Sequence, residues 1–157
     1  MKVGLDIDDV ICNLCVDMIP KMNKRFGTNL DYRNLPTYNV EQLGIPLQDF
    51  YKFVKNECDS YVTSPPMRGA SEITKRLIDD GHEVYLITAR SNLFSRNMVD
   101  VTRSWLAVHN ISYTDVVFDA HKKKGEIAKS LGIKAFLDDR PEELEDMVKH
   151  GVNAYLF

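Results

Sequence analysis

The stretch Lys2-Val-Gly-Leu-Asp-Ile-Asp-Asp9 decides which fold this chain can adopt. From Val3 to Ile7 it is apolar except for one carboxylate, Asp6, which is typical of a short buried strand. A second carboxylate, Asp8, follows two residues later. In open α/β sheets the chemistry lies beyond the carboxyl ends of the strands. The stretch therefore predicts a buried strand that brings two carboxylates to that edge.

A second acidic pair, Asp138 and Asp139, closes another apolar segment, 134–137. If the two strands are neighbours, four carboxylates converge on one point. At ~4 Å and an effective dielectric constant of ~20, each pair of unit charges repels by roughly 4 kcal/mol. Such a cluster needs a cation or shifted pKa values, and oxygen ligands favour Mg²⁺. The pattern therefore predicts a magnesium-dependent phosphoryl-transfer site.

Composition limits the kinds of protein this can be. The 157 residues fit one domain, and 20 Lys and Arg against 23 Asp and Glu give a net charge of −3. This balance argues against binding a nucleic-acid polymer, although a single nucleotide could still fit a pocket.

Location and redox state can also be predicted. The absence of a long apolar run and of a signal peptide predicts no membrane segment. Three cysteines, an odd number, fit a reducing cytoplasm. The Cys12-x-x-Cys15 pair is expected to be two ordinary buried thiols, because a zinc site would need two further ligands, with only Cys58 and scattered histidines available.

Hydrophobic periodicity predicts the order of elements. Between the first strand and Met67 we expect helices over 13–26 and 47–58, a loop or irregular segment over 28–46 and no strand. Beyond this interval we expect helices over 70–80, 94–109, 124–131 and 141–150, and strands over 83–88, 115–118, 134–137 and 152–156. This alternation predicts a doubly wound parallel α/β sheet formed by residues 1–12 and 68–157, with residues 13–67 inserted as a small helical cap.

Four strings in this order resemble the motifs of the haloacid dehalogenase (HAD) superfamily. They are Asp6-Ile-Asp8-Asp9-Val10, Leu86-Ile-Thr88-Ala-Arg90, the Lys122-Lys-Lys124 run before a helix, and Phe136-Leu-Asp138-Asp139-Arg-Pro-Glu. The Thr-Ala-Arg and Asp-Asp-Arg-Pro strings are most similar to the short 5′(3′)-deoxyribonucleotidases. The resemblance spans nearly the whole chain. It implies a HAD-like, Rossmannoid fold with a C1-type cap, and a Mg²⁺-dependent phosphomonoesterase that forms an aspartyl-phosphate and hydrolyses (deoxy)nucleoside monophosphates.

The resemblance also implies roles for the acidic residues. Asp6 would be the nucleophile that attacks phosphorus. Mg²⁺ would be held by Asp6, the backbone carbonyl of Asp8 and Asp138, with Asp139 as an outer or water-mediated ligand. Asp8 would protonate the leaving alcohol and then deprotonate water. Asp9 departs from the pattern, because the superfamily commonly has glycine at this position.

Substrate contacts are implied at the other two motifs. Thr88 would hydrogen-bond a phosphoryl oxygen beside Ala89, and Arg90 would reach the substrate or clamp the cap. Lys124 best fits the lysine that neutralises the phosphate, with Lys122 and Lys123 as alternatives.

Simpler interpretations stay open for several residues. Asp6 and Asp8 could form a strand-end turn or N-cap, most of the lysine run could be a solvated face, and Arg140 could pair locally with Glu142 or Glu143. The cap aromatics could stack on a nucleobase or form the core of the cap; they are Tyr32, Tyr38, Phe50, Tyr51, Phe53 and Tyr61.

Function has two alternatives. The Asp-Asp-Arg string and its following helix also resemble polynucleotide 3′-phosphatase domains, which would make the protein an end-processing enzyme. A non-catalytic HAD-like binding module is the third interpretation, although a pure binder has no use for an acid at Asp8. The expected partner is a small phosphomonoester, and the chain could form a homodimer.

Overall fold

A computed structural model describes residues 1–35, 39–56, 59–92 and 97–157. Within these residues five parallel strands form one sheet in the order β3-β2-β1-β4-β5. The strands are β1 (Lys2–Leu5), β2 (Glu83–Ile87), β3 (Asp115–Val117), β4 (Ala135–Asp138) and β5 (Asn153–Leu156). The chain builds β1, β2 and β3 outward and then returns to the other side of β1. The strand order therefore reverses between β1 and β4, where α/β sheets place their ligands.

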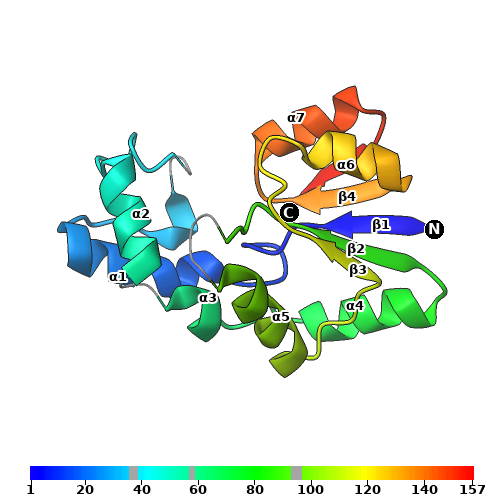
Figure 1. Ribbon diagram of the computed structural model, residues 1–157, viewed down its shortest axis with the longest axis horizontal. Coiled ribbons are helices and arrows are strands. Elements are labelled where there is room, and N and C mark those ends of the chain that lie inside the picture. Colours follow the sequence, from blue (N-terminus) through cyan, green and yellow to red (C-terminus); the bar gives the residue numbers. More distant parts are fainter. Residues whose placement is uncertain (36–38, 57–58, 93–96) are drawn as a thin grey trace.

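Helices cover both faces of this sheet (Figure 1). On one face lie α4 (Ala70–Asp79) and α5 (Met98–Val108), and on the other lie α6 (Lys124–Leu131) and α7 (Pro141–Lys149). Successive side chains of a strand point to opposite faces. Accordingly, Leu86 of β2 packs in the same apolar cluster as Trp105, and Ile87 in a second cluster with Met147. The predicted doubly wound α/β fold is confirmed.

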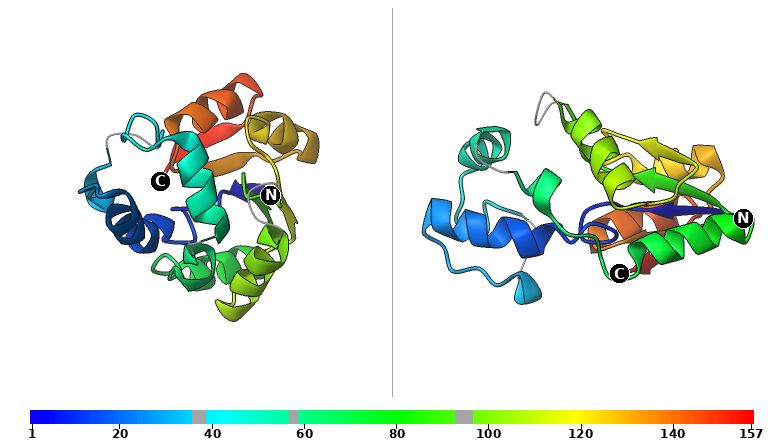
Figure 2. Two further views of the ribbon diagram at one scale, coloured as in Figure 1. Left: turned by 60° about the vertical axis from the view of Figure 1, so that its left-hand side comes forward. Right: turned by 90° about the horizontal axis from the view of Figure 1, so that it is seen from below.

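Residues 13–67, here called the helical insert, separate β1 from α4. The insert contains α1 (Leu14–Phe26), the 3₁₀ helix η1 (Tyr32–Asn34), α2 (Leu47–Asn56) and α3 (Ser60–Thr63), and its described residues form no strand. Its helices lie beyond the carboxyl ends of the strands in two views (Figures 1 and 2). The boundaries at residues 12/13 and 67/68, and the action of the insert as a cap, stay predictions.

Most predicted elements lie within one or two residues of the observed ones, but two short elements were missed. Residues 57–58 and 94–96, at the ends of two predicted helices, lie outside the described residues. Residues 28–46 were predicted to form a loop or irregular segment, and within them η1 forms where the Asp31 carboxylate accepts a hydrogen bond from the backbone N–H of Arg33 at 3.0 Å. The four-residue α3 has too few residues for an apolar period. No helix in the described parts of the chain is long and apolar enough to cross a membrane.

Candidate active site

The first two acidic motifs meet where β1 and β4 end side by side. Leu5 pairs with Leu137, and the Asp6 backbone N–H donates to the Leu137 carbonyl at 3.0 Å. This pairing places Asp6, Asp138 and Asp139 so that one carboxylate oxygen of each lies within 4.8 Å of the others. Asp6 and Asp138 are buried. Three of the four predicted carboxylates therefore converge.

Lys124 supplies the positive charge inside this cluster. Its ammonium donates to Asp138 Oδ2 at 2.7 Å and lies 2.8 Å from Asp6 Oδ1. Burial alone would lower the pKa of Lys124, but the charges of Asp6 and Asp138 outweigh it and raise that pKa. Lys122 and Lys123 are exposed. Of the three candidate lysines, the fold brings Lys124 to the carboxylates because it begins α6 facing the sheet.

The electrostatics of Asp6 fit a divalent cation. Burial raises the pKa of Asp6, Lys124 opposes this, and the charges of Asp138 and Asp8 add to it. The Lys124 ammonium pairs with Asp6 Oδ1 at 2.8 Å, but Asp138 and Asp139 also lie within 4.8 Å of Asp6. One ammonium against three carboxylates leaves negative charge, which suits an oxygen-ligated cation such as Mg²⁺.

The side chain of Asp8 does not join the cluster, because Arg90 binds it. The Arg90 Nη2 atom lies 2.6 Å from Asp8 Oδ1, and Nε lies 3.1 Å from both carboxylate oxygens. Arg90 also donates to Thr102 of α5 at 3.1 Å, and its guanidinium lies 4.9 Å from the ring centre of Tyr61. Burial would lower the pKa of Arg90, but the charge of Asp8 raises it. Arg90 therefore connects Asp8 to α3 of the insert. Of its two predicted roles, this contact fits the one in which Arg90 clamps the cap.

Thr88 and Ala89, which precede Arg90, differ in their access to the cavity. Thr88 is fully buried, and its hydroxyl oxygen accepts a hydrogen bond from the Arg90 backbone N–H at 3.1 Å. Its neighbour Ala89 lines the site cavity. Thr88 as a phosphate ligand stays a prediction.

Asp9 has a left-handed backbone, with a φ of 54°. This conformation is the one that favours glycine, which explains why the superfamily commonly has glycine there. In this chain the Asp9 carboxylate accepts a hydrogen bond from the Cys15 backbone N–H at 2.9 Å, at the start of α1. The side chain thus gains a capping role that partly offsets the backbone strain.

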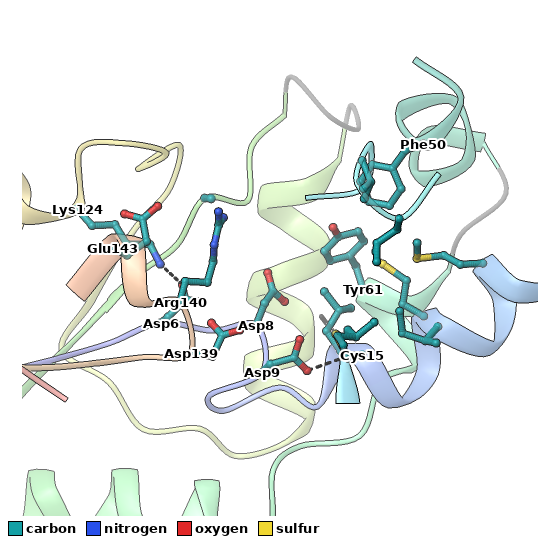
Figure 3. A pocket seen from close by; sticks show the side chains of 18 residues that line it. Asp6, Asp8, Asp9, Cys15, Phe50, Tyr61, Lys124, Asp139, Arg140 and Glu143 are labelled. Atoms are coloured by element: carbon teal, nitrogen blue, oxygen red, sulfur yellow. Dashed lines mark hydrogen bonds and ion pairs between the residues drawn. The ribbon is translucent and has the colours of Figure 1, made fainter. Parts of the chain in front are cut away.

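A cavity of about 200 Å³ extends from the carboxylates into the insert (Figure 3). At one end lie Asp6, Asp139 and Lys124. The other end is lined by apolar side chains of the insert: Leu14, Met18, Ile19, Met22, Leu35, Val40, Leu43 and Phe50. The cavity therefore has one charged end and one apolar end.

Three of the six cap aromatics occupy positions that fit one of the two predicted roles. Phe50 and Tyr61 line the cavity. Phe53 is buried and meets Phe26 edge-on at 5.5 Å between ring centres, so it belongs to the core. Tyr32 and Tyr51 are largely exposed, and Tyr38 lies outside the described residues.

Beyond the Asp138-Asp139 pair, two charged residues that line the cavity were not predicted as site residues. They are Arg140 and Glu143, which follow the Asp138-Asp139 pair. Among the described residues Arg140 forms no ion pair with Glu142 or Glu143, so the expected local pairing was wrong. The available signal was their position directly after the strand end that carries the candidate carboxylates Asp138 and Asp139.

The cysteines behave as ordinary thiols. Burial raises the pKa of Cys12 to about 12 and raises that of Cys15 as well. No cluster of metal-ligating side chains in the described part of the chain contains a cysteine, and Cys58 lies outside it.

Because the four motifs that resemble the HAD superfamily lie at the sheet edge where that chemistry takes place, the protein is a phosphomonoesterase of the HAD class. A more specific assignment comes from the sequence as a whole. The model of the family described as 5′ nucleotidase, deoxy (Pyrimidine), cytosolic type C protein matches residues 1–154. The chain belongs to this family.

Individual relatives agree with this assignment. A Bacillus cereus protein, provisionally named a nucleotidase, is 27% identical over 165 residues, covering 99% of this chain and 85% of that protein. A Chlorobaculum tepidum protein, provisionally named a 5′(3′)-deoxyribonucleotidase, is 24% identical over 164 residues, covering 99% and 77%. The structure of a HAD-superfamily hydrolase from Geobacter sulfurreducens shares the fold, with a TM-score of 0.58 at 16% identity over 99% of this chain and 88% of that one.

Proposed function

We propose that this protein is a Mg²⁺-dependent nucleotidase that hydrolyses (deoxy)nucleoside monophosphates through an aspartyl-phosphate on Asp6. The observation that carries the proposal is the cavity itself. It joins a buried nucleophile, paired with Lys124, to an apolar end large enough to receive part of a substrate. The family description and the names of the relatives support a nucleotide as that substrate.

Asp6, Asp138 and Asp139 would hold the cation, together with the backbone carbonyl of Asp8. When bound, Mg²⁺ neutralises phosphate charge and polarises the phosphoryl oxygens, so that an anionic nucleophile can approach. The oxygen-only cluster, in which one ammonium faces three carboxylates, supports this assignment.

In the first step an oxygen of Asp6 attacks phosphorus in line, and the bond to the leaving oxygen breaks. Lys124 neutralises charge on the phosphoryl group. Asp8 gives its proton to the leaving oxygen, which departs as an alcohol. Water then attacks phosphorus and gives its proton to Asp8, and the bond between phosphorus and Asp6 breaks. Phosphate leaves, and both carboxyl groups return to their starting states.

Arg90 orients Asp8. Both Asp8 oxygens accept hydrogen bonds from the guanidinium of Arg90, which holds the carboxyl group beside the cavity. Since the same guanidinium contacts Tyr61 of the insert, movement of the insert would alter this contact.

The insert would act as the cap of the site. Its apolar residues would cover the base and exclude water from the phosphoryl group while the aspartyl-phosphate exists. Phe50 and Tyr61 are the described aromatic side chains placed to contact a base.

The test is phosphate release, with Mg²⁺ and with chelator, from 5′- and 3′-mononucleotides, sugar phosphates and a 3′-phosphorylated oligonucleotide. We expect Mg²⁺-dependent release from mononucleotides and none from the folded Asp6→Asn variant. Preference for the oligonucleotide would favour an end-processing enzyme. No release from any substrate would contradict the proposal and favour a binding module.

A further inference from the structure

Thr102 is a polar residue on the buried face of α5. Its side chain is fully buried, and the other buried residues of this helix are Met98, Trp105 and Leu106. Valine has nearly the same branched shape and would bury only apolar atoms at this position. Because a buried hydroxyl is favourable only where its hydrogen bonds are made, the contacts of Thr102 should explain why it is there.

The hydroxyl of Thr102 is a hydrogen-bond acceptor with a fixed direction. It donates its hydrogen to the carbonyl oxygen of Met98, one turn earlier in α5, at 2.8 Å. A hydroxyl has one hydrogen, so only the lone pairs of Oγ1 remain for other partners. Oγ1 accepts a hydrogen bond from Nη1 of Arg90 at 3.1 Å. The threonine is therefore a buried acceptor directed at the guanidinium of Arg90.

The contact with Thr102 fixes the guanidinium from the side opposite to Asp8. On one edge, Nε and Nη2 of Arg90 donate to Asp8, the shortest contact being 2.6 Å. On the other side, Nη1 donates to Thr102. A planar guanidinium that is bound on two sides cannot rotate without losing hydrogen bonds on one of them. The direction of the Asp8 carboxyl group thus depends on both contacts.

Thr102 and Tyr61, the aromatic neighbour of Arg90, belong to different parts of the molecule. Tyr61 lies in α3 of the insert, with its ring centre 4.9 Å from the guanidinium. Thr102 lies in α5, one of the helices that cover the sheet (Figure 1). The position of Thr102 is therefore set by the α/β core that also carries Asp6 and Lys124.

We propose that Thr102 is a positioning residue for the acid–base chemistry of Asp8. It holds the Arg90 guanidinium, which in turn holds the Asp8 carboxyl group beside the cavity, where the leaving oxygen receives its proton. The inference rests on the proposed function for the role of Asp8. It adds a residue of α5, outside the four sequence motifs, to those on which this role depends.

The test uses two leaving groups that need an acid to different degrees. The alcohol of a nucleotide or sugar phosphate leaves poorly unless it is protonated, whereas p-nitrophenol leaves readily as an anion. The ratio of interest is kcat/KM for the best nucleoside monophosphate or sugar phosphate, divided by kcat/KM for p-nitrophenyl phosphate. These values include the attack of Asp6 but not the later hydrolysis of the aspartyl-phosphate.

Thr102→Val should lower this ratio by acting on one substrate. A general acid typically contributes roughly 10²–10⁴-fold, and a misdirected Asp8 should lose part of this. We expect kcat/KM to fall at least about tenfold for the alcohol-releasing substrate and less than about twofold for p-nitrophenyl phosphate. Thr102→Ser keeps the hydroxyl and should keep the wild-type ratio. Thr102→Ala lacks it and should lower the ratio, so this pair carries the test if Thr102→Val does not fold.

Thr74→Val is the matched control. Thr74 is a buried threonine of α4 that donates to the Ala70 carbonyl at 2.8 Å and accepts the backbone N–H of Ser112 at 3.2 Å. Its replacement by valine therefore removes the same kinds of hydrogen bond as Thr102→Val does. Neither partner lines the site cavity, so Thr74→Val should keep the wild-type ratio.

An unchanged ratio in Thr102→Val or Thr102→Ala would overturn the inference, and so would equal losses for both substrates, which would show a role in packing alone. A lowered ratio in Thr102→Ser or in Thr74→Val would show that the hydroxyl contact with Arg90 is not the cause. Release by the wild type from sugar phosphates but not from mononucleotides would refute the proposed function and leave the inference testable on the sugar phosphate. If neither class releases phosphate, both fail, because Asp8 then has no leaving alcohol to protonate.

Discussion

At the residue scale, the pairing of β1 with β4 depends on the glycine at position 4, which has no side chain. A Cβ atom at Gly4 would overlap the ring of Phe136 on the neighbouring strand. We expect Gly4→Ala to lower the free energy of unfolding by about 1–3 kcal/mol, as overpacked cores do. Denaturant unfolding measures this, and an unchanged free energy would show that the ring moves away at no cost.

The carboxylates predict a pH-dependent affinity for cations. Because burial raises the pKa of Asp6, lowering the pH protonates this group while an ordinary carboxyl would still be charged. A cation must then displace a proton, so its affinity falls as the pH falls. Calorimetric titration with Mg²⁺ or Mn²⁺ at pH 8 and pH 6 should show weaker binding at pH 6. Equal affinity at both pH values would mean that the cation does not displace a proton from Asp6.

The thiols give a prediction that does not depend on substrate. With raised pKa values, Cys12 and Cys15 stay protonated at pH 8, and only thiolates react quickly with iodoacetamide. Mass spectrometry should find both unmodified in the folded protein and both modified in denaturant. Rapid labelling of either in the folded protein would mean a reactive thiol and would reopen a redox role for the pair.

At the element scale, Arg90 connects the loop after β1, which carries Asp8, to helices α3 and α5. Replacing one partner of a buried ion pair typically costs about 3–5 kcal/mol. Since the Asp8 side chain is 26% exposed, we expect Arg90→Met to lie near the lower end of this range. The exposed Arg76→Met is the control and should cost at most about 1 kcal/mol. Similar losses in both variants, measured by denaturant unfolding, would mean that water already screens the Asp8–Arg90 pair.

The elements that could be predicted from sequence are those with a clear apolar periodicity and, for helices, a glycine after the last turn. The helix ending at Phe26 is confirmed, and Gly27 adopts the left-handed backbone expected of a glycine after a helix. The missed α3 depends instead on polar contacts. Lys21 reaches from α1 to Asp59 and to Thr63, contacts that no hydrophobic pattern reveals.

At the scale of the whole molecule, strand order was the step that sequence patterns left open. The pairing of β1 with β4 brings Asp6 beside Asp138, although β2 and β3 come between these two strands in the sequence. The resemblance to the HAD superfamily predicted that the two acidic motifs meet, whereas the partners of Asp8 depend on side-chain packing. A cytoplasmic location and a homodimer stay predictions.

The central claim is that Asp6 carries the phosphoryl group, and an acid quench during turnover tests it most directly. The wild type is mixed with a nucleoside monophosphate and Mg²⁺, quenched, digested and examined by mass spectrometry, with Asp6→Asn and a chelator-treated sample as controls. We predict one phosphoryl group on the peptide that contains Asp6, absent from both controls. Phosphate release without this adduct, together with an active Asp6→Asn variant, would contradict the account.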